Sequence, residues 1–166
     1  MLNPIDPETV IRDGGAAGRY PDEIHEGVAW WVGACLVVAT RAARIAVAHD
    51  GNPTSLLFHR RLCRGVMNAQ HFACTIHDLH HADRVGLLAA MKELGGAPGA
   101  MVTTTSAGGV ETVAIMLFDR HGEPLAEEAG LARIRQMIAD DQVPRPVNDQ
   151  ARGCLKPYSG QEGAGQ

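Results

Sequence analysis

The alternation of helix-like and strand-like segments between residues 22 and 139 constrains the fold of this chain most. Apolar residues recur at three- and four-residue steps from Ile24 to Val38, which predicts a buried helix that Asp22 caps and that ends near Ala43. Strand-like and helical segments then follow in turn. This order predicts an α/β fold, a three-layer sandwich around a mixed, mainly parallel sheet of four strands.

The remaining boundaries follow from caps, prolines and glycines. Asn52 followed by Pro53 predicts a helix start, with the helix reaching Asn68, and Asp83 starts another that Gly95 and Gly96 end. A last helix spans 126–139. The predicted strands are 44–48, 71–76, 100–104 and 113–118, the last antiparallel to the third after a glycine turn. We expect one domain, 1–141, and a poorly structured tail, 142–166.

Polar side chains follow each of the three predicted parallel strands. Ligands of open α/β sheets bind beyond the carboxyl ends of such strands, and the helices that start there offer free N–H groups to an anion. The three ends therefore predict one pocket. Its candidate residues are His49 and Asp50; His77, Asp78, His80 and His81; and Thr103, Thr104, Thr105 and Ser106.

The chemistry predicted for this pocket is proton transfer by histidine, which titrates near neutrality. His80 or His81 would act as base, oriented by Asp78 or Asp50. Ser106 or Thr105 would act as nucleophile or hydrogen-bond donor. His77, His80, His81 and Asp83 are also competent metal ligands, but their spacing matches no familiar coordination geometry. We therefore predict a metal-free site without a cofactor, and structural roles for His25, His59, His71 and His121.

Composition restricts the partners of the chain. A net charge of −4 gives it no electrostatic reason to bind nucleic acid or an anionic membrane, and no segment has the ~20 apolar residues that span a bilayer. No secretory leader is recognisable, so we expect a cytoplasmic protein. The cysteines, Cys35, Cys63, Cys74 and Cys154, form no C-x-x-C pair and are expected to be small hydrophobic residues without a functional role.

The segment MVTTTSAGGVETVAIMLFDRHGEPL, residues 101–125, places four hydroxyl residues between an apolar strand and a glycine turn. It resembles the active-serine segment of the phosphohexomutases, which reads roughly M-[IV]-T-A-S-H-N-P, then N-G-[IM]-K-[LF]-F-D, then D-G-x-P-L. The match holds at both ends and breaks in the middle. The phosphorylated serine of the family falls on Ser106 or Thr105, and the His and Asn that follow it have no counterpart.

Other segments resemble the same family in the same order. They cover residues 10 to about 140, which corresponds to the first of four phosphohexomutase domains, and the resemblance implies the fold of that domain. Within it, Arg12 would contact an anionic substrate. The matching segments are VIRD at 10–13, YPDEI at 20–24, AHDGN at 48–52, 75–79 and 95–102. The metal loop, sugar loop and phosphate clamp of the later domains are missing from this sequence.

Three hypotheses about function follow. The first is a stand-alone enzyme that uses histidine and hydroxyl groups for acid–base chemistry of the isomerase or lyase type on a small metabolite, with a sugar phosphate as one candidate. The second is a non-catalytic binder or regulator that recognises a sugar phosphate. The third is an interaction module, either one subunit of a split mutase or a homo-oligomer that buries the helix carrying Trp30 and Trp31. We favour the first.

Overall fold

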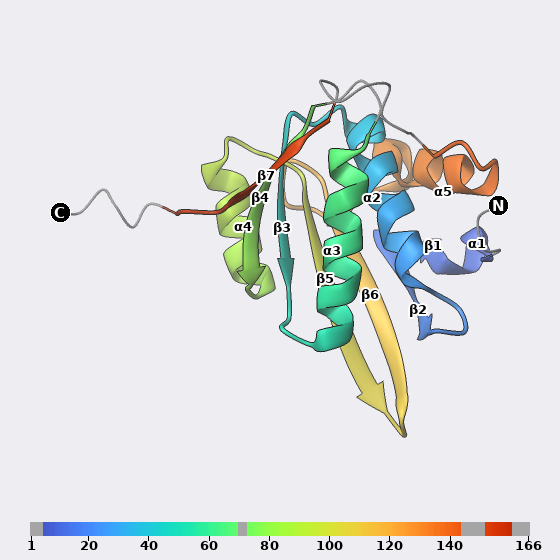
Figure 1. Ribbon diagram of the computed structural model, residues 1–166. Helices are drawn as coiled ribbons and strands as arrows, with labels where there is room; N and C mark the ends of the chain where they lie inside the picture. The colour runs from blue at the N-terminus through green and yellow to red at the C-terminus, as the bar shows by residue number, and fades with distance from the viewer. Residues whose placement is uncertain (1–4, 70–72, 144–151, 161–166) are drawn as a thin grey trace.

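A seven-stranded mixed sheet forms the centre of the molecule (Figure 1). The structure, a computed structural model, describes residues 5–69, 73–143 and 152–160. The strand order is β1-β2-β6-β5-β3-β4-β7. The strands are β1 (Ile11–Arg12), β2 (Gly15–Tyr20), β3 (Arg44–His49), β4 (Thr75–His81), β5 (Gly99–Ala107), β6 (Val110–Phe118) and β7 (Cys154–Pro157). The neighbours β5, β3, β4 and β7 are parallel, and β6, β2 and β1 join antiparallel.

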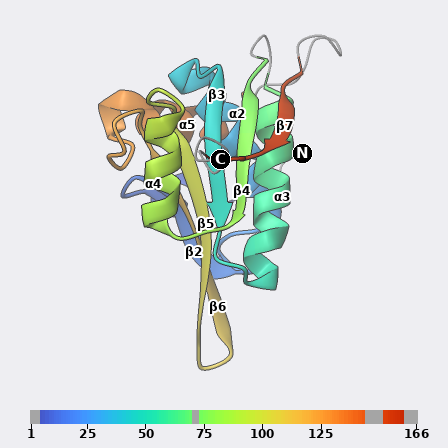
Figure 2. The same cartoon turned by 90° about the vertical axis from the view of Figure 1, so that its left-hand side faces the viewer.

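Helices cover both faces of this sheet, which confirms the predicted three-layer α/β architecture (Figures 1 and 2). One face carries α2 (Glu26–Thr40), α3 (Pro53–Met67) and α5 (Ala132–Ala139), and α4 (Arg84–Glu93) lies on the other. The larger apolar core lies under α2 and α3 and includes Leu36, Val47 and Phe58. A smaller core under α4 includes Leu87 and Met101. A short helix, α1 (Pro7–Val10), precedes the sheet.

Two helix starts lie where the sequence predicts them. The Asn52 side chain accepts a hydrogen bond from Thr54 N at 2.8 Å, and Pro53 opens α3. Asp83 caps α4 by accepting from Gly86 N at 2.8 Å. Helix α2 starts later than predicted, because the His25 ring, rather than Asp22, caps it by accepting from Gly27 N at 3.1 Å. The predicted last helix ends at Ala139 as expected, but a π-turn (Glu127–Leu131) replaces its first part and α5 begins only at Ala132, since Gly130 has a φ of 148°.

The sheet is wider than the four strands that the sequence predicts. Strands β1 and β2 lack the apolar alternation of an ordinary strand, and β2 exists because it pairs with β6 along its whole length. Strand β7 lies within the C-terminal segment for which we expected little structure, and it pairs with β4. The second predicted strand also differs, since β4 runs on to His81; His71 lies outside the described residues.

Strands β5 and β6 form a long hairpin that projects beyond the body of the molecule (Figures 1 and 2). Gly108 and Gly109 make a two-residue turn with φ of 58° and 79°, a conformation that glycine adopts without strain. The pairing is continuous from Gly99↔Phe118 to Ala107↔Val110. The antiparallel connection predicted after the third strand is therefore confirmed. The strand was predicted to end at Thr104, but it continues for three more residues and ends at Ala107.

No helix in the described part of the chain is long and apolar enough to cross a membrane.

Candidate functional site

The carboxyl ends of β3 and β4 bring together most of the histidines that the sequence singles out. His49 ends β3 and pairs with His81 of β4 on one side and with Val102 of β5 on the other. A register shift between Val47 and His49 interrupts the regular pairing of β3 with β4 at this level. The irregularity leaves His80 with a φ of 59°, which a residue with a side chain adopts only where its surroundings hold it.

Asp78 is the buried centre of this region, with only 4% of the residue exposed. Its two carboxylate oxygens lie 3.1 and 3.2 Å from His59 Nε2. The backbone N–H of His80 donates to Asp78 Oδ1 at 2.8 Å, and His80 Nδ1 lies 3.3 Å from Oδ2. Burial alone would raise the pKa of the Asp78 carboxyl, but the hydrogen bond and charge of His59 and the His80 N–H hold that pKa below its usual value.

His59 is the partner of Asp78 that sequence reasoning missed, because we expected it to be only a structural residue. It lies on the face of α3 that packs against the sheet, together with the buried Phe58, Leu62 and Val66. The residue is 3% exposed, and its Nδ1 has no hydrogen-bond partner. A histidine on the apolar stripe of a helix was the available signal, since such a buried ring requires a polar partner somewhere in the fold.

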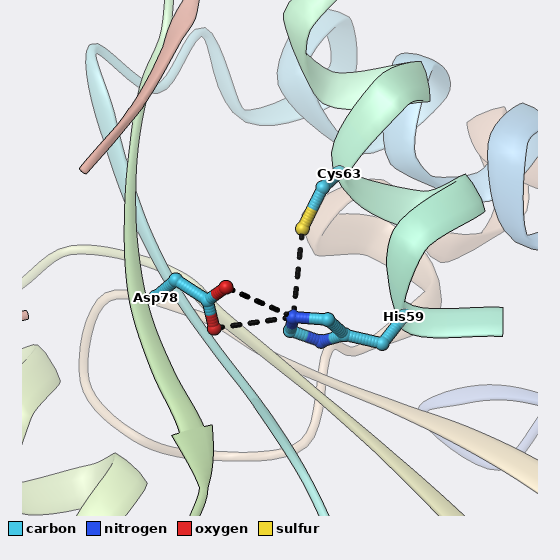
Figure 3. Close-up of side chains that lie close together, drawn as sticks. All are labelled: His59, Cys63 and Asp78. Carbon is cyan, nitrogen blue, oxygen red and sulfur yellow. Dashed lines mark hydrogen bonds and ion pairs between the residues drawn. The ribbon is translucent and has the colours of Figure 1, made fainter. Parts of the chain in front are cut away.

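Cys63 lies one helical turn after His59 and points into the same place (Figure 3). Its Sγ is 3.8 Å from His59 Nε2, so the thiol and the Asp78 carboxylate approach the same ring nitrogen. Cys63 is 3% exposed, and burial, followed by the nearby Asp78 charge, raises the pKa of its thiol. Three potential metal ligands therefore converge: the Nε2, Sγ and carboxylate oxygen of this group all lie within 4.8 Å of one another.

His49 connects this buried group to the surface. Its ring meets the His59 ring edge-on at a centroid distance of 4.7 Å and is stacked with the exposed His81 ring at 6.3 Å. The backbone N–H of Gly51 donates to His49 Nδ1 at 3.0 Å, which assigns the proton of the neutral ring to Nε2. Burial, and next the proximity of His59, lower the pKa of His49, so the neutral form is favoured.

His81, the exposed member of the His59, His49 and His81 group, lines a pocket of about 360 Å³. Its lining residues are Asp50, His81, Ala82, Asp83 and Met101, and neither lysine nor arginine occurs among them. The His81 ring packs against Gly51, where a Cβ atom would lie only 3.0 Å from the ring. A larger pocket of about 530 Å³ is lined by Arg44 and Gly96, at the amino ends of β3 and β5, the opposite end of these strands from His49.

Asp50 is fixed by the strands beside it. Thr104 N donates to Asp50 Oδ2 at 2.8 Å and Asn52 N to Oδ1 at 3.0 Å. Burial would raise the pKa of the Asp50 carboxyl, but these N–H groups and the Ser55 hydroxyl donate to it and keep that pKa below its usual value. Ser55, fully buried, also shares a hydrogen bond of 2.6 Å with Thr104 Oγ1. Asp50 is therefore an ionised, rigidly held wall of the pocket.

Thr105 and Ser106 do not join this pocket. They lie in the projecting part of the hairpin, both exposed, opposite Thr112 and Glu111. Ser106 is four residues beyond Val102, the residue level with His81, and two strands away, which places it roughly 16 Å from His81. The structure thus separates the two candidates for the serine of the family from the histidines that we expected to act with them.

The other candidate residues do not line the His81 pocket either. Arg12 lies on β1, four strands from β3 and so roughly 19 Å away, with an exposed side chain beside Asp13. His77 precedes Asp78 in β4 and so points to the opposite face, where its Nε2 is buried without a partner; burial lowers its pKa. Thr103 lies on β5 next to Thr104 and is half-buried.

Comparison with known proteins supports the resemblance at the level of the fold. A phosphoglucomutase/phosphomannomutase family protein from Burkholderia thailandensis superimposes with a TM-score of 0.68 over 93% of this chain, at 15% identity. A protein assigned as a phosphomannomutase from Thermus thermophilus superimposes with a TM-score of 0.67 over 90% of this chain, at 19% identity. The chain covers 34% and 33% of the lengths of these two proteins. No protein-family model and no curated sequence matches it.

Proposed function

We propose that this protein is an enzyme that acts on a small metabolite by acid–base chemistry, with His81 as the proton-transfer group. The observation that carries the proposal is the position of His81, an exposed residue that lines a pocket together with Asp50 and Asp83. An imidazole in an accessible pocket with fixed carboxylates is the usual arrangement for general acid–base catalysis. Between the two histidines predicted as base, His81 is favoured because it is the one that lines the pocket.

The surroundings of His81 hold its ring in place. It is stacked with His49 at an interplanar angle of 13°, and it packs against Gly51, where an added Cβ would lie 3.0 Å from the ring. Asp50, on the other side, is fixed by the two backbone N–H groups of Thr104 and Asn52. Such fixed geometry supports catalysis because the reacting groups need little reorganisation.

The charges of the pocket indicate the substrate class. Asp50 and Asp83 lie in its lining, and the neighbouring Arg84 instead has its guanidinium 5.1 Å from the centre of the Phe118 ring. Two carboxylates without a lining cation disfavour a phosphate and favour a neutral or cationic polar molecule. The proposed substrate is therefore a small hydroxylated carbonyl compound rather than a sugar phosphate.

The proposed reaction is of the isomerase or lyase type. His81 takes a proton from a carbon next to the carbonyl, and the electron pair of the C–H bond moves to the carbonyl oxygen to form an enolate. In an isomerase reaction, the enolate oxygen takes the proton of the hydroxyl group on the neighbouring carbon, and His81 returns its proton to the former carbonyl carbon, so that the carbonyl group moves by one carbon. In a lyase reaction, the electron pair of the enolate instead expels a leaving group from the carbon on the other side, and His81 keeps or passes on the proton. Asp50 and Asp83 accept hydrogen bonds from the hydroxyl groups of the substrate.

A second candidate is one part of a composite sugar-phosphate mutase, either catalytic with a partner chain or a binder of sugar phosphates. The observation that favours it is coverage, since the chain corresponds to about a third of two solved structures of the phosphoglucomutase/phosphomannomutase type. The continuous hairpin in place of a serine loop makes it the weaker candidate.

Proton exchange with solvent tests the two candidates together. The protein is incubated in deuterated water with aldoses and ketoses, and with hexose 1- and 6-phosphates, while NMR follows the loss of C–H signals. We expect exchange in one of the unphosphorylated compounds, lost in His81→Asn and retained in His121→Asn, a variant of an exposed histidine far from the pocket. Exchange in none of them, or exchange that survives His81→Asn, would refute the proposal. Binding of hexose phosphates without exchange would favour the second candidate.

A further inference from the structure

We propose that His59, Cys63 and Asp78 form a binding site for one transition-metal ion of the zinc type, between α3 and β4. The inference does not depend on the proposed reaction at His81. It starts from the buried group in Figure 3, in which two residues one helical turn apart on α3 face a carboxylate of the neighbouring strand.

The separations between the three side chains suit a single ion. His59 Nε2 lies 3.1 Å from Asp78 Oδ1 and 3.8 Å from Cys63 Sγ. Zinc binds nitrogen and oxygen at about 2.0–2.2 Å and sulfur at about 2.3 Å, so ligand atoms of a tetrahedral site lie roughly 3.3–3.8 Å apart. The two separations from Nε2 need shifts of only a few tenths of an ångström, and the third, between Cys63 Sγ and the Asp78 carboxylate, is at most 4.8 Å, so these two groups must approach each other by up to about 1 Å to bind one ion.

The arrangement is not that of a nucleophilic cysteine. In a cysteine–histidine–carboxylate relay, the thiol and the carboxylate bind different nitrogens of the imidazole. Here both approach Nε2, while Nδ1 of His59 is buried without a partner. One nitrogen cannot take a proton from the thiol while it donates one to the carboxylate. Three groups that point at a common centre are instead the arrangement of ligands around a cation.

Charge balance in the interior also supports a divalent ion. The three residues are between 3% and 4% exposed, and an unpaired charge there would be costly. A thiolate at Cys63 and a carboxylate at Asp78 carry two negative charges, which one divalent cation neutralises. On binding, the thiol releases its proton to solvent and its lone pair bonds to the metal, while the proton that His59 Nε2 donates to Asp78 moves to Nδ1 so that Nε2 can bind the ion.

The mixture of ligand atoms selects the type of metal. A thiolate, an imidazole and a carboxylate suit zinc or cobalt, whereas magnesium and calcium prefer oxygen ligands alone. Among the residues that the structure describes, three side chains form this group, so one position of a tetrahedral ion is left for a fourth ligand. The His49 ring lies beside that of His59, with the two ring centres 4.7 Å apart.

Titration with cobalt tests the site, because a bond between cobalt and a thiolate gives an intense near-ultraviolet charge-transfer band. The full chain is stripped of metal with a chelator, and Co²⁺ is added while absorbance is recorded. We expect saturation at one ion per chain and displacement of the cobalt by Zn²⁺. The Cys63→Ser variant should lose the band and weaken binding by at least about tenfold.

Two controls separate this site from adventitious binding. Cys154→Ser removes the exposed thiol and Cys35→Ser removes another buried thiol, and both should retain the band. Circular dichroism establishes that Cys63→Ser is folded, and His59→Gln provides a second ligand variant should it not be. The absence of a charge-transfer band in the folded wild-type chain, or a band that survives both Cys63→Ser and His59→Gln, would overturn the proposal.

Discussion

Two polar segments that look equivalent in the sequence, His77–His81 and Thr103–Ser106, have different surroundings in the fold. The first ends at the carboxyl edge of β4, where Asp78 is buried and binds His59 and His80. The second continues along β5 into the projecting hairpin, where Thr105 and Ser106 are exposed. The difference arises because β5 has an antiparallel neighbour, β6, that accompanies it past the edge of the sheet, whereas β4 has no such partner. Polar residues after an apolar strand segment therefore contribute to a site only where the strand ends there and does not continue into a hairpin.

The largest difference between the two segments should be in stability. Asp78→Ala leaves His59 and the backbone N–H of His80 without their buried acceptor, and we expect it to lower the free energy of unfolding by about 3 kcal/mol. Ser106→Ala, in the hairpin, should change it by less than about 0.5 kcal/mol. Urea unfolding measures both values. Equal effects would mean that the two segments are energetically alike.

Glycine replacements compare the pocket with the hairpin turn. Gly51 has a φ of 84°, and an added Cβ would lie 3.0 Å from the His81 ring, whereas Gly108, with a φ of 58°, has no atom within 4 Å of such a Cβ. Both alanine variants bear the cost of a left-handed backbone, about 1 kcal/mol, and in Gly51→Ala the His81 ring must also shift away from the new Cβ, for a total of about 2 kcal/mol. Thermal unfolding of the two variants checks the order. A Gly108→Ala variant that is the less stable of the two would contradict it.

Thr104 and Thr105, which lie on either side of the point where β5 leaves the body of the protein, provide the next test. Thr104→Val keeps the shape of the side chain but removes the 2.6 Å hydrogen bond with the buried Ser55, at a cost of about 1 kcal/mol. Thr105→Val, one residue further along β5, should be neutral or slightly stabilising, because valine favours exposed strand positions. Chemical denaturation of the pair locates the point at which β5 leaves the body of the protein. The prediction fails if Thr105→Val is the more damaging change.

The smallest expected effect is a pH dependence at Asp50. Its pKa in the folded protein lies below the unfolded value of about 3.9, so its ionised form stabilises the fold above that pH, and the contribution is lost as the pH falls through the folded pKa. Asp50→Asn should therefore reduce the loss of stability between roughly pH 5 and pH 3, by less than about 1 kcal/mol. Melting temperatures of both proteins across this range measure it. Parallel curves would refute a role for this carboxylate.

The sequence predicts those parts of the fold that local chemistry determines. Asn52 and Pro53 mark the start of α3, Asp83 marks that of α4, and the paired glycines mark the turn of the hairpin. Each of these features depends on a few neighbouring residues. The alternation of helices and strands and the resemblance to phosphohexomutases both predict the three-layer arrangement, which the structural comparisons confirm.

Features that depend on distant residues could not be predicted. His59 and Asp78 are separated by 19 positions, and nothing local identifies them as partners. Strand β2 contains two alanines and two glycines and becomes a strand only by pairing with β6. From the sequence, we expected the histidines at the end of β4 to lie in a loop. They belong to the strand instead, and the register shift at this level depends on pairing with β3, which the local sequence does not show.

The exposed turn at Gly108 and Gly109 has a practical consequence for protein engineering. An added Cβ at either glycine would meet no atom within 4 Å, and the flanking strand residues Ala107 and Val110 are exposed. Loop tips of this kind accept inserted peptides readily. A fluorescent reporter or an affinity epitope placed between the two glycines should leave both the fold and the His81 pocket intact, so the hairpin offers an attachment point for observing this molecule at work.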